Sequence, residues 1–175
     1  MPIRAIIRPV HELTPQEKQA ASEIDRIAFA GTLDDARIKV WATSEWLTLG
    51  FLEDQLVSVV GILVREVLLA GQPIRMGGIG GVATLPEWRR RGFSGALLDR
   101  SAEFLRDPLK VDFSFLVCAP EKVPFYARHG WQEIHNQVVC DQPEGKVDLD
   151  GVAMVLPSLQ KRWTEGVLDL CGLPW

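Results

Sequence analysis

Cysteine is scarce in this chain of 175 residues. The three that occur, Cys118, Cys140 and Cys171, are far apart and form no C-x-x-C pair. Such an odd, scattered set excludes a disulfide framework and a cysteine-based zinc site, and it is typical of reduced thiols in a cytoplasmic protein. We therefore expect a cytoplasmic location and no bound metal.

Long hydrophobic runs and an excess of positive charge are also missing. No run approaches the roughly 20 apolar residues of a membrane span, and the first residues alternate charged with apolar side chains, unlike a signal peptide. The net charge of −4 argues against a nucleic-acid-binding protein and mildly favours a cationic partner. With 47% hydrophobic and 24% charged residues, the composition suits a single globular domain over residues 1–175.

Two familiar phosphate-binding signatures are absent or misplaced. The chain has no Walker-type G-x-x-x-x-G-K-[ST]. Residues 78–83, Gly-Ile-Gly-Gly-Val-Ala, match G-x-G-x-x-G/A by letter. A dinucleotide site needs that motif to open a helix, whereas these residues continue as a strand into Thr84-Leu85-Pro86. A dinucleotide site is therefore disfavoured.

What the chain does contain is a basic turn between a strand and a helix, in the stretch from Ile79 to Leu98. The strand stops at Pro86, three arginines follow, and small residues then open an amphipathic helix. Free backbone N–H groups and the helix dipole favour an anion at such a point, although an ordinary helix start with solvated arginines is the alternative. The residues expected to hold phosphate are Arg89, Arg90, Arg91, Gly92, Phe93, Ser94 and Gly95.

Hydrophobic periodicity and turn residues predict alternating strands and helices along the rest of the chain. The expected strands are 3–10, 46–52, 56–69, 74–84, 113–118, 131–140 and 152–156. The expected helices are 15–29, 33–41, 94–106 and 120–128. Residues 141–151 are expected to form a loop.

Two of these motifs resemble those of the GCN5-related N-acetyltransferases (GNAT). Residues 89–94 are similar to the family's acyl-CoA signature Arg/Gln-x-x-Gly-x-Gly/Ala, with Ser94 at the last position. Tyr126, Gly130 and Trp131 match Tyr-x-x-x-Gly-[Phe/Trp]. The resemblance implies an α/β fold with a mixed, mostly antiparallel central sheet, splayed between its fourth and fifth strands and flanked by about four helices. It also implies an acetyl-CoA-dependent N-acetyltransferase.

The resemblance assigns roles in acetyl transfer to two residues. Tyr126 would protonate the departing thiolate, which a phenol of pKa about 10 can do for a thiol of pKa about 8.5. The backbone N–H of Val82 would stabilise the oxyanion, and pantetheine would pair with main chain near Val82 and Thr84. The alternatives are a packing tyrosine and an ordinary core valine. Ala119 stands where the family often has an asparagine.

The layout of nearly the whole chain resembles the aminoglycoside 2′-N-acetyltransferases. The matching segments include residues 28–31, Ala-Phe-Ala-Gly, residues 81–83, Gly-Val-Ala, and the final tryptophan. In those enzymes a glutamate directly before Gly-Val-Ala relays the proton, but here that position is Gly80. The sequence leaves the base open among Asp34, Asp148, Asp150, Asp169, His135 and the Trp175 carboxylate.

The same resemblance implies a small cationic amine as acceptor, such as an aminoglycoside-like aminosugar. Two acidic contacts of the relatives are replaced, by Thr32 and Leu173. Acetyl-CoA and the amine are the expected partners, with a homodimer allowed and neither nucleic acid nor membrane involved. A protein or peptide amine as acceptor, and a non-catalytic acyl-CoA-binding module, are the alternatives. The residues expected to hold the acceptor are Asp34, Asp148, Asp150, Asp169 and Trp175.

Overall fold

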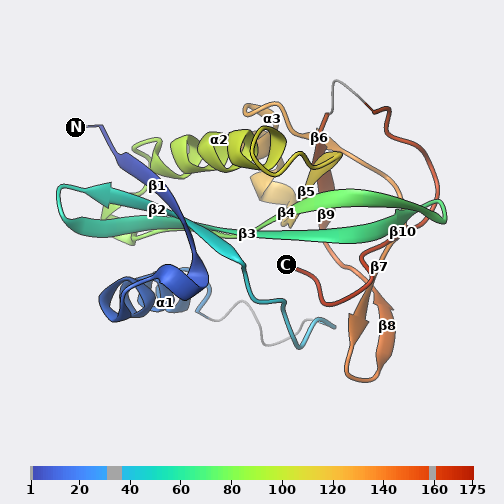
Figure 1. Cartoon of the computed structure of the whole chain (residues 1–175), viewed down its shortest axis with the longest axis horizontal. Coiled ribbons are helices and arrows are strands. Elements are labelled where there is room, and N and C mark those ends of the chain that lie inside the picture. Colours follow the sequence, from blue (N-terminus) through green and yellow to red (C-terminus); the bar gives the residue numbers. More distant parts are fainter. Residues whose placement is uncertain (1, 31–36, 158–160) are drawn as a thin grey trace.

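One mixed sheet organises the computed structural model, which describes residues 2–30, 37–157 and 161–175 (Figure 1). In this part of the chain the sheet has ten strands. They are β1 Arg4–Pro9, β2 Trp46–Leu52, β3 Gln55–Leu69, β4 Gln72–Thr84, β5 Phe113–Cys118, β6 Gln132–Glu133, β7 Val138–Gln142, β8 Gly145–Asp148, β9 Val152–Leu156 and β10 Leu168–Asp169. The α-helices are α1 Pro15–Ala28, α2 Phe93–Arg106 and α3 Val123–Ala127, and short 3-10 turns cover Val10–Glu12, Pro86–Trp88 and Pro120–Lys122. The expected mixed α/β architecture is confirmed.

The long β3–β4 hairpin is the centre of the sheet. Ala70 (φ 50°) and Gly71 (φ 77°) form its two-residue turn, with the positive φ angles that match the twist of the flanking strands. One edge of β3 pairs first with β2 and then, near Leu69, with β10, which carries the β7–β8 hairpin. The outer edge of β4 pairs with β5, followed by β9 and β6.

β4 and β5 diverge from one another like the arms of a fork. They pair in parallel over three rungs, the last of which joins Gly78 to Phe115. Beyond that rung, the β5-facing edge of β4 has no strand partner among the described residues. The predicted splay between the fourth and fifth strands is therefore confirmed.

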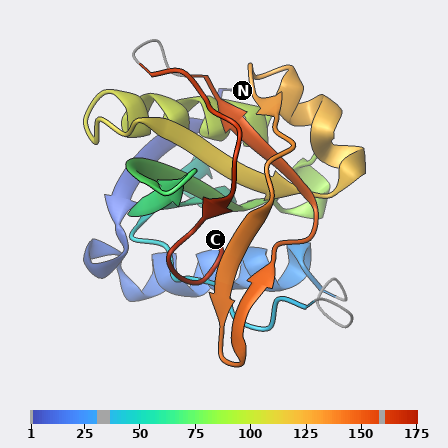
Figure 2. The ribbon, with the colours of Figure 1, turned by 90° about the vertical axis from the view of Figure 1, so that its right-hand side faces the viewer.

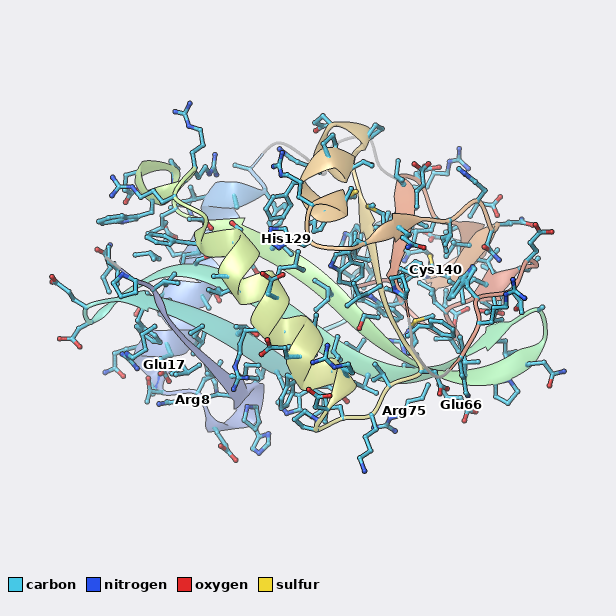
Figure 3. The ribbon with its side chains drawn as sticks, turned by 90° about the horizontal axis from the view of Figure 1, so that it is seen from above. Arg8, Glu17, Glu66, Arg75, His129 and Cys140 are labelled. Atoms are coloured by element: carbon cyan, nitrogen blue, oxygen red, sulfur yellow. The ribbon has the colours of Figure 1, made fainter. Side chains whose placement is uncertain are left out.

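The helices lie on opposite faces of this sheet. In Figures 1 and 2, α2 and α3 cover one face, while α1 and the C-terminal end of the chain lie on the other. A capping box between Thr14 and Glu17 starts α1, and Pro15 occupies its first turn, as expected. Arg8 on β1 also binds Glu17, at 2.9 and 3.1 Å, and so ties the helix to the sheet (Figure 3).

Three side-chain clusters form the core. Ile24 of α1 packs with Leu49, and Leu97 of α2 packs with Ile79 on the opposite face. The third cluster joins Phe115 to the β7–β10 region and includes Trp175 at its border. The last residue of the chain therefore packs at the fork.

The chain departs from the predicted elements after α1 and after α3. Residues 37–41 of the expected second helix are not helical, and 33–36 lie outside the described residues. Three α-helices are present in the described segments instead of about four. The expected strand 131–140 is divided into β6, which pairs with β9, and β7, which pairs with β8 and β10. Between them, the side chain of Asn136 binds the carbonyls of Thr164 and Gly166 at 3.1 and 2.7 Å. The expected loop 141–151 contains β8.

Candidate active site

The start of α2 presents free backbone donors. Gly92 is its N-cap in the left-handed region (φ 81°), with no side-chain cap and no acidic residue in the first turn. Ala96 makes the first helical bond, donating to the Gly92 carbonyl at 3.1 Å. The N–H groups of Phe93, Ser94 and Gly95 therefore have no partner within the helix and are suited to an anion.

A chain of three hydroxyls, two of them on buried residues, fixes this turn to the sheet. Ser58 of β3 lies 2.7 Å from the Thr84 hydroxyl, which lies 2.7 Å from the Ser94 hydroxyl. Ser58 also donates to the carbonyl of Ala83 at 2.8 Å. The departure from Gly or Ala at position 94 is thus explained: the extra hydroxyl is bound inside the protein. The side chain of Thr84 has the same structural role, which leaves its main chain for the predicted contact with pantetheine.

The three arginines differ in their surroundings. The Nε of Arg89 donates to the Thr84 carbonyl at 3.0 Å, and Arg91 stacks on Trp88 at 4.8 Å from the ring centroid. Arg90 adopts φ 63° and is exposed, with no hydrogen bond or ion pair to the described residues. Arg89 and Arg91 therefore shape the turn, whereas Arg90 is free to meet a phosphate.

A β-bulge in β4 lies at the predicted oxyanion position. Val59 pairs with Ala83 and Gly61 with Gly80, so Val60 faces both Gly81 and Val82. Gly81 has φ 56°, which a glycine adopts without strain. A bulge leaves one backbone N–H without a partner in the β3–β4 pairing. Here the bulge lies in the part of β4 that no longer pairs with β5. The role of Val82 as the oxyanion donor stays a prediction.

Tyr126 enters the same cluster as Val82 from α3. Its side chain is buried beside Leu98 and Met154, yet its hydroxyl has no hydrogen-bond partner among the described residues. Burial, and then the nearby Cys118, raise the pKa of Tyr126 above its ordinary value. The phenol therefore stays protonated and able to donate to a departing sulfur.

Cys118 and His129 flank this region. Burial, helped by Glu121 and Glu133, raises the pKa of Cys118 to about 11, so this thiol stays neutral. His129 lies beside α2 in Figure 3, and its Nδ1 is 2.7 Å from Asp99. A Cβ on Gly95 would lie 2.6 Å from this imidazole, which explains glycine at that position.

The C-terminal residue covers the base of the fork. The Trp175 indole packs on Gly78, and its Nε1 donates to the Phe115 carbonyl at 3.4 Å. The carboxyl carbon of Trp175 lies 2.7 Å from where a Cβ on Gly80 would be. A carboxylate thus borders Gly80 on β4.

Asp25 of α1 is a further acidic group that the sequence interpretation missed. Its Oδ1 lies 3.6 Å from where a Cβ on Gly81 would be, on the bulge. The side chain keeps access to solvent, but the protein around it is dense enough that desolvation raises the pKa of Asp25. The Asp25 carboxylate has no hydrogen bond or ion pair to the described residues. The available signal was the pair Ala21 and Ala28, which lie four residues before and three after Asp25 on the same face of the helix.

Three other predicted acceptor residues, Asp148, Asp150 and Asp169, have protein partners. Asp148 accepts from Gln137 Nε2 at 2.7 Å, and Asp150 pairs with Arg37 at 3.3 Å. Asp169 binds Lys146 at 2.8 Å and the Cys171 N–H at 2.9 Å. His135 is exposed in the β6–β7 connection, and Asp34 lies outside the described residues. The acceptor roles of these residues stay predictions.

Among the described residues, no group of three or more His, Cys, Asp or Glu is arranged to hold a metal ion. In the same segments, no helix has the length and apolar character needed to cross a membrane.

This arrangement can hold a phosphate-bearing arm at α2 and direct its acyl end along the open edge of β4 toward an amine. That is the task of an acyl-CoA-dependent N-acyltransferase. The chain belongs to the GNAT acetyltransferase family, because the family model described as an acetyltransferase (GNAT) domain matches residues 9–134. The enzymes of this family use acetyl-CoA, and the free donors at α2 and the open edge of β4 fit it.

Solved structures share the fold at low sequence identity. The chain is similar to ElaA of Escherichia coli (TM-score 0.64, 16% identity, 89% of this chain and 100% of that chain). It is also similar to an acyl-CoA N-acyltransferase of Pseudomonas aeruginosa (0.65, 13%, 89% and 100%). The ribosomal-protein-S18-alanine N-acetyltransferase of E. coli aligns too (0.56, 16%, 88% and 94%).

Proposed function

We propose that this acetyltransferase transfers the acetyl group of acetyl-CoA to a primary amine of a small cationic acceptor, such as an aminoglycoside-like aminosugar. The observation that carries the proposal is the position of two carboxylates at neighbouring glycines. Trp175 borders Gly80, and Asp25 borders Gly81. A cationic ligand that leaves water needs such anions around it, because desolvated charge is costly unless it is paired.

In this proposal the Trp175 carboxylate is the general base. Two carbon–carbon bonds of about 1.5 Å place a glutamate carboxyl carbon about 2.5 Å from its own Cβ. The Trp175 carboxyl carbon lies 2.7 Å from the Cβ position of Gly80, which is nearly the same distance. The chain terminus therefore supplies, from another part of the sequence, the carboxylate that a glutamate at position 80 would supply.

The remaining residues take the following roles. Asp25 holds a charged amine of the acceptor, and the carboxylate of Trp175 accepts the proton from the attacking nitrogen. The N–H of Val82 stabilises the negative charge that develops on the acyl oxygen. The hydroxyl of Tyr126 donates its hydrogen to the CoA sulfur as that sulfur leaves. Acetyl-CoA supplies the activated acyl group.

A small acceptor is favoured over a peptide because the tail is flanked by another segment of the chain. The N–H of Ala42 donates to the Pro174 carbonyl at 2.7 Å. The N–H groups of Lys39 and Val40 bind the side chain of Gln142 at 2.9 and 3.0 Å. These contacts hold residues 39–42 against the tail and β7, where an extended peptide would need an open channel.

The experiment is a thiol-release assay with acetyl-CoA and a panel of acceptors. Aminoglycosides and simple diamines should be acetylated, whereas neutral monoamines and peptides should react slowly. Preferential turnover of a peptide would overturn the acceptor class. Binding of CoA without turnover of any amine would favour a non-catalytic module. The proposal also includes a cytoplasmic location, and the homodimer stays a prediction for sedimentation analysis.

A further inference from the structure

Arg65 of β3 contacts the C-terminal tail at several points. Its Nη1 donates to the carbonyl of Leu170 at 3.1 Å and to the carbonyl of Leu173 at 2.9 Å. The guanidinium carbon also lies 5.2 Å from the ring centroid of Trp175, within the range of a cation–π contact. A single side chain in the sheet thus fixes three of the last six residues.

Glycine makes the room that this arrangement needs. A Cβ on Gly172 would lie 2.5 Å from Arg65 Nη1, so any other residue there would displace the guanidinium. On the facing strand, Gly78 leaves space for the Trp175 indole and Gly80 leaves space for its carboxyl group. Gly78 and Gly80 of β4 and Arg65 of β3 therefore form one binding surface for the tail.

Placing the Arg65 guanidinium here costs desolvation free energy, which an aliphatic side chain would not. Desolvation lowers the pKa of Arg65, although Cys171, Asp141 and Glu45 partly oppose the effect. A half-buried cation in a strand is less favourable than an aliphatic side chain unless its hydrogen bonds are needed. The hydrogen bonds of Arg65 go to main-chain carbonyls, so they fix the path of the tail backbone as well as the Trp175 ring.

We propose that Arg65 is a positioning residue, which holds the tail in register so that the Trp175 carboxylate stays beside Gly80. The proposal rests on the proposed function, in which that carboxylate is the base. The tail is also held by main-chain hydrogen bonds, from Leu170 N–H to Val139, from Asp141 N–H to Gly172 and from Ala42 N–H to Pro174, and by the Trp175–Phe115 hydrogen bond. Arg65 differs from each of these because one side chain joins Leu170, Leu173 and Trp175 to each other.

The first measurement is hydrogen exchange of the tail in Arg65→Met, which keeps an aliphatic side chain and loses the donors. The amides of residues 166–175 should exchange about tenfold faster or more, because local opening becomes easier. Arg75→Met is the matched control, since Arg75 lies on the neighbouring strand and contacts the Leu109 carbonyl instead of the tail (Figure 3). Arg65→Lys keeps the charge with one compact donor group and should be intermediate.

The second measurement is kinetic. Arg65→Met should lower kcat roughly 10- to 100-fold, as expected for a misplaced catalytic group, with an unchanged KM for acetyl-CoA. In a background where Trp175 is deleted and Gly80→Glu supplies the carboxylate, Arg65→Met should have no effect on kcat. A merely structural role would lower kcat equally in both backgrounds.

The outcomes separate this proposal from the proposed function. Unchanged exchange and unchanged kcat in Arg65→Met would overturn the positioning role and leave the acetyl-transfer proposal intact. Faster exchange with a full rate would overturn both the positioning role and the assignment of Trp175 as base. An equal loss of rate in both backgrounds, or a loss with Arg75→Met of the same size, would also overturn it.

Discussion

Deleting Trp175 and restoring a carboxylate from Gly80 tests whether the chain terminus acts as the base. The deletion removes the carboxyl group that lies 2.7 Å from the Cβ position of Gly80 and moves the terminal carboxylate one residue back, to Pro174, whose carbonyl is bound by Ala42 instead. Loss of a general base typically costs roughly 10²–10⁴-fold in rate. We expect a fall in kcat within this range, measured by thiol release at saturating acetyl-CoA.

Gly80→Glu in the deleted chain should recover a large part of that loss. Gly80 does not have positive φ, so its backbone accepts a side chain, and the departure of Trp175 leaves the space. The glutamate carboxyl carbon then lies about 2.5 Å from its Cβ, close to the original 2.7 Å. We expect recovery of at least about tenfold, which is about 1.4 kcal/mol of transition-state free energy.

Two matched variants make the result specific. Gly80→Gln in the deleted chain has the same shape without the basic oxygen and should recover nothing. Gly80→Glu in the intact chain should lower activity, because its side chain collides with Trp175. The reasoning is refuted if the deleted chain keeps its rate, or if the glutamate and glutamine variants behave alike. An unchanged KM for acetyl-CoA shows that the β4–β5 fork is still intact in each variant.

Three further predictions concern other parts of the site. Tyr126→Phe should lower kcat roughly 10²–10⁴-fold with a nearly unchanged KM for acetyl-CoA. Because burial raises the pKa of Tyr126, the pH–rate profile of the wild type should show no decline from tyrosine ionisation below about pH 10. Asp25→Asn should raise KM for a cationic acceptor several-fold. Desolvation raises the pKa of Asp25, so ionisation of this carboxyl group destabilises the folded state. Asp25→Asn should therefore raise the melting temperature at pH 7. This gain should vanish below the ordinary aspartate pKa of about 3.9, where the carboxyl group is protonated in the folded and unfolded states. Ser94→Ala should cost about 1 kcal/mol in urea unfolding and leave acetyl-CoA binding intact, because the lost hydrogen bond is internal.

The sequence predicted those features that depend on neighbouring residues. Pro86, the arginines and Gly92 mark the strand end, the turn and the helix start, and all of these are local signals. The fork followed from the family resemblance that these signals support. The start of α1 was equally readable, from Thr14, Pro15 and Glu17.

Features that depend on distant contacts were not readable from local pattern. The division of the expected strand 131–140 is one example, because the partners of the intervening Asn136, Thr164 and Gly166, lie about 30 residues further along the chain. Asp25 looked like an ordinary polar position of an amphipathic helix until the bulge at Gly81 was placed opposite it. Arg65 gave no signal at all, because its role depends on where the tail folds.

Amine-dependent release of CoA thiol by the purified, intact chain tests the central claim most directly. The account predicts that acetyl-CoA is consumed only when an amine is present, fastest with small polycationic acceptors, and that Tyr126→Phe is slower by at least about 10²-fold. Calorimetry on the same preparation establishes that CoA binds. Binding of CoA with no amine-dependent release across the whole panel, or equal rates for wild type and Tyr126→Phe with chemistry limiting, would contradict the account.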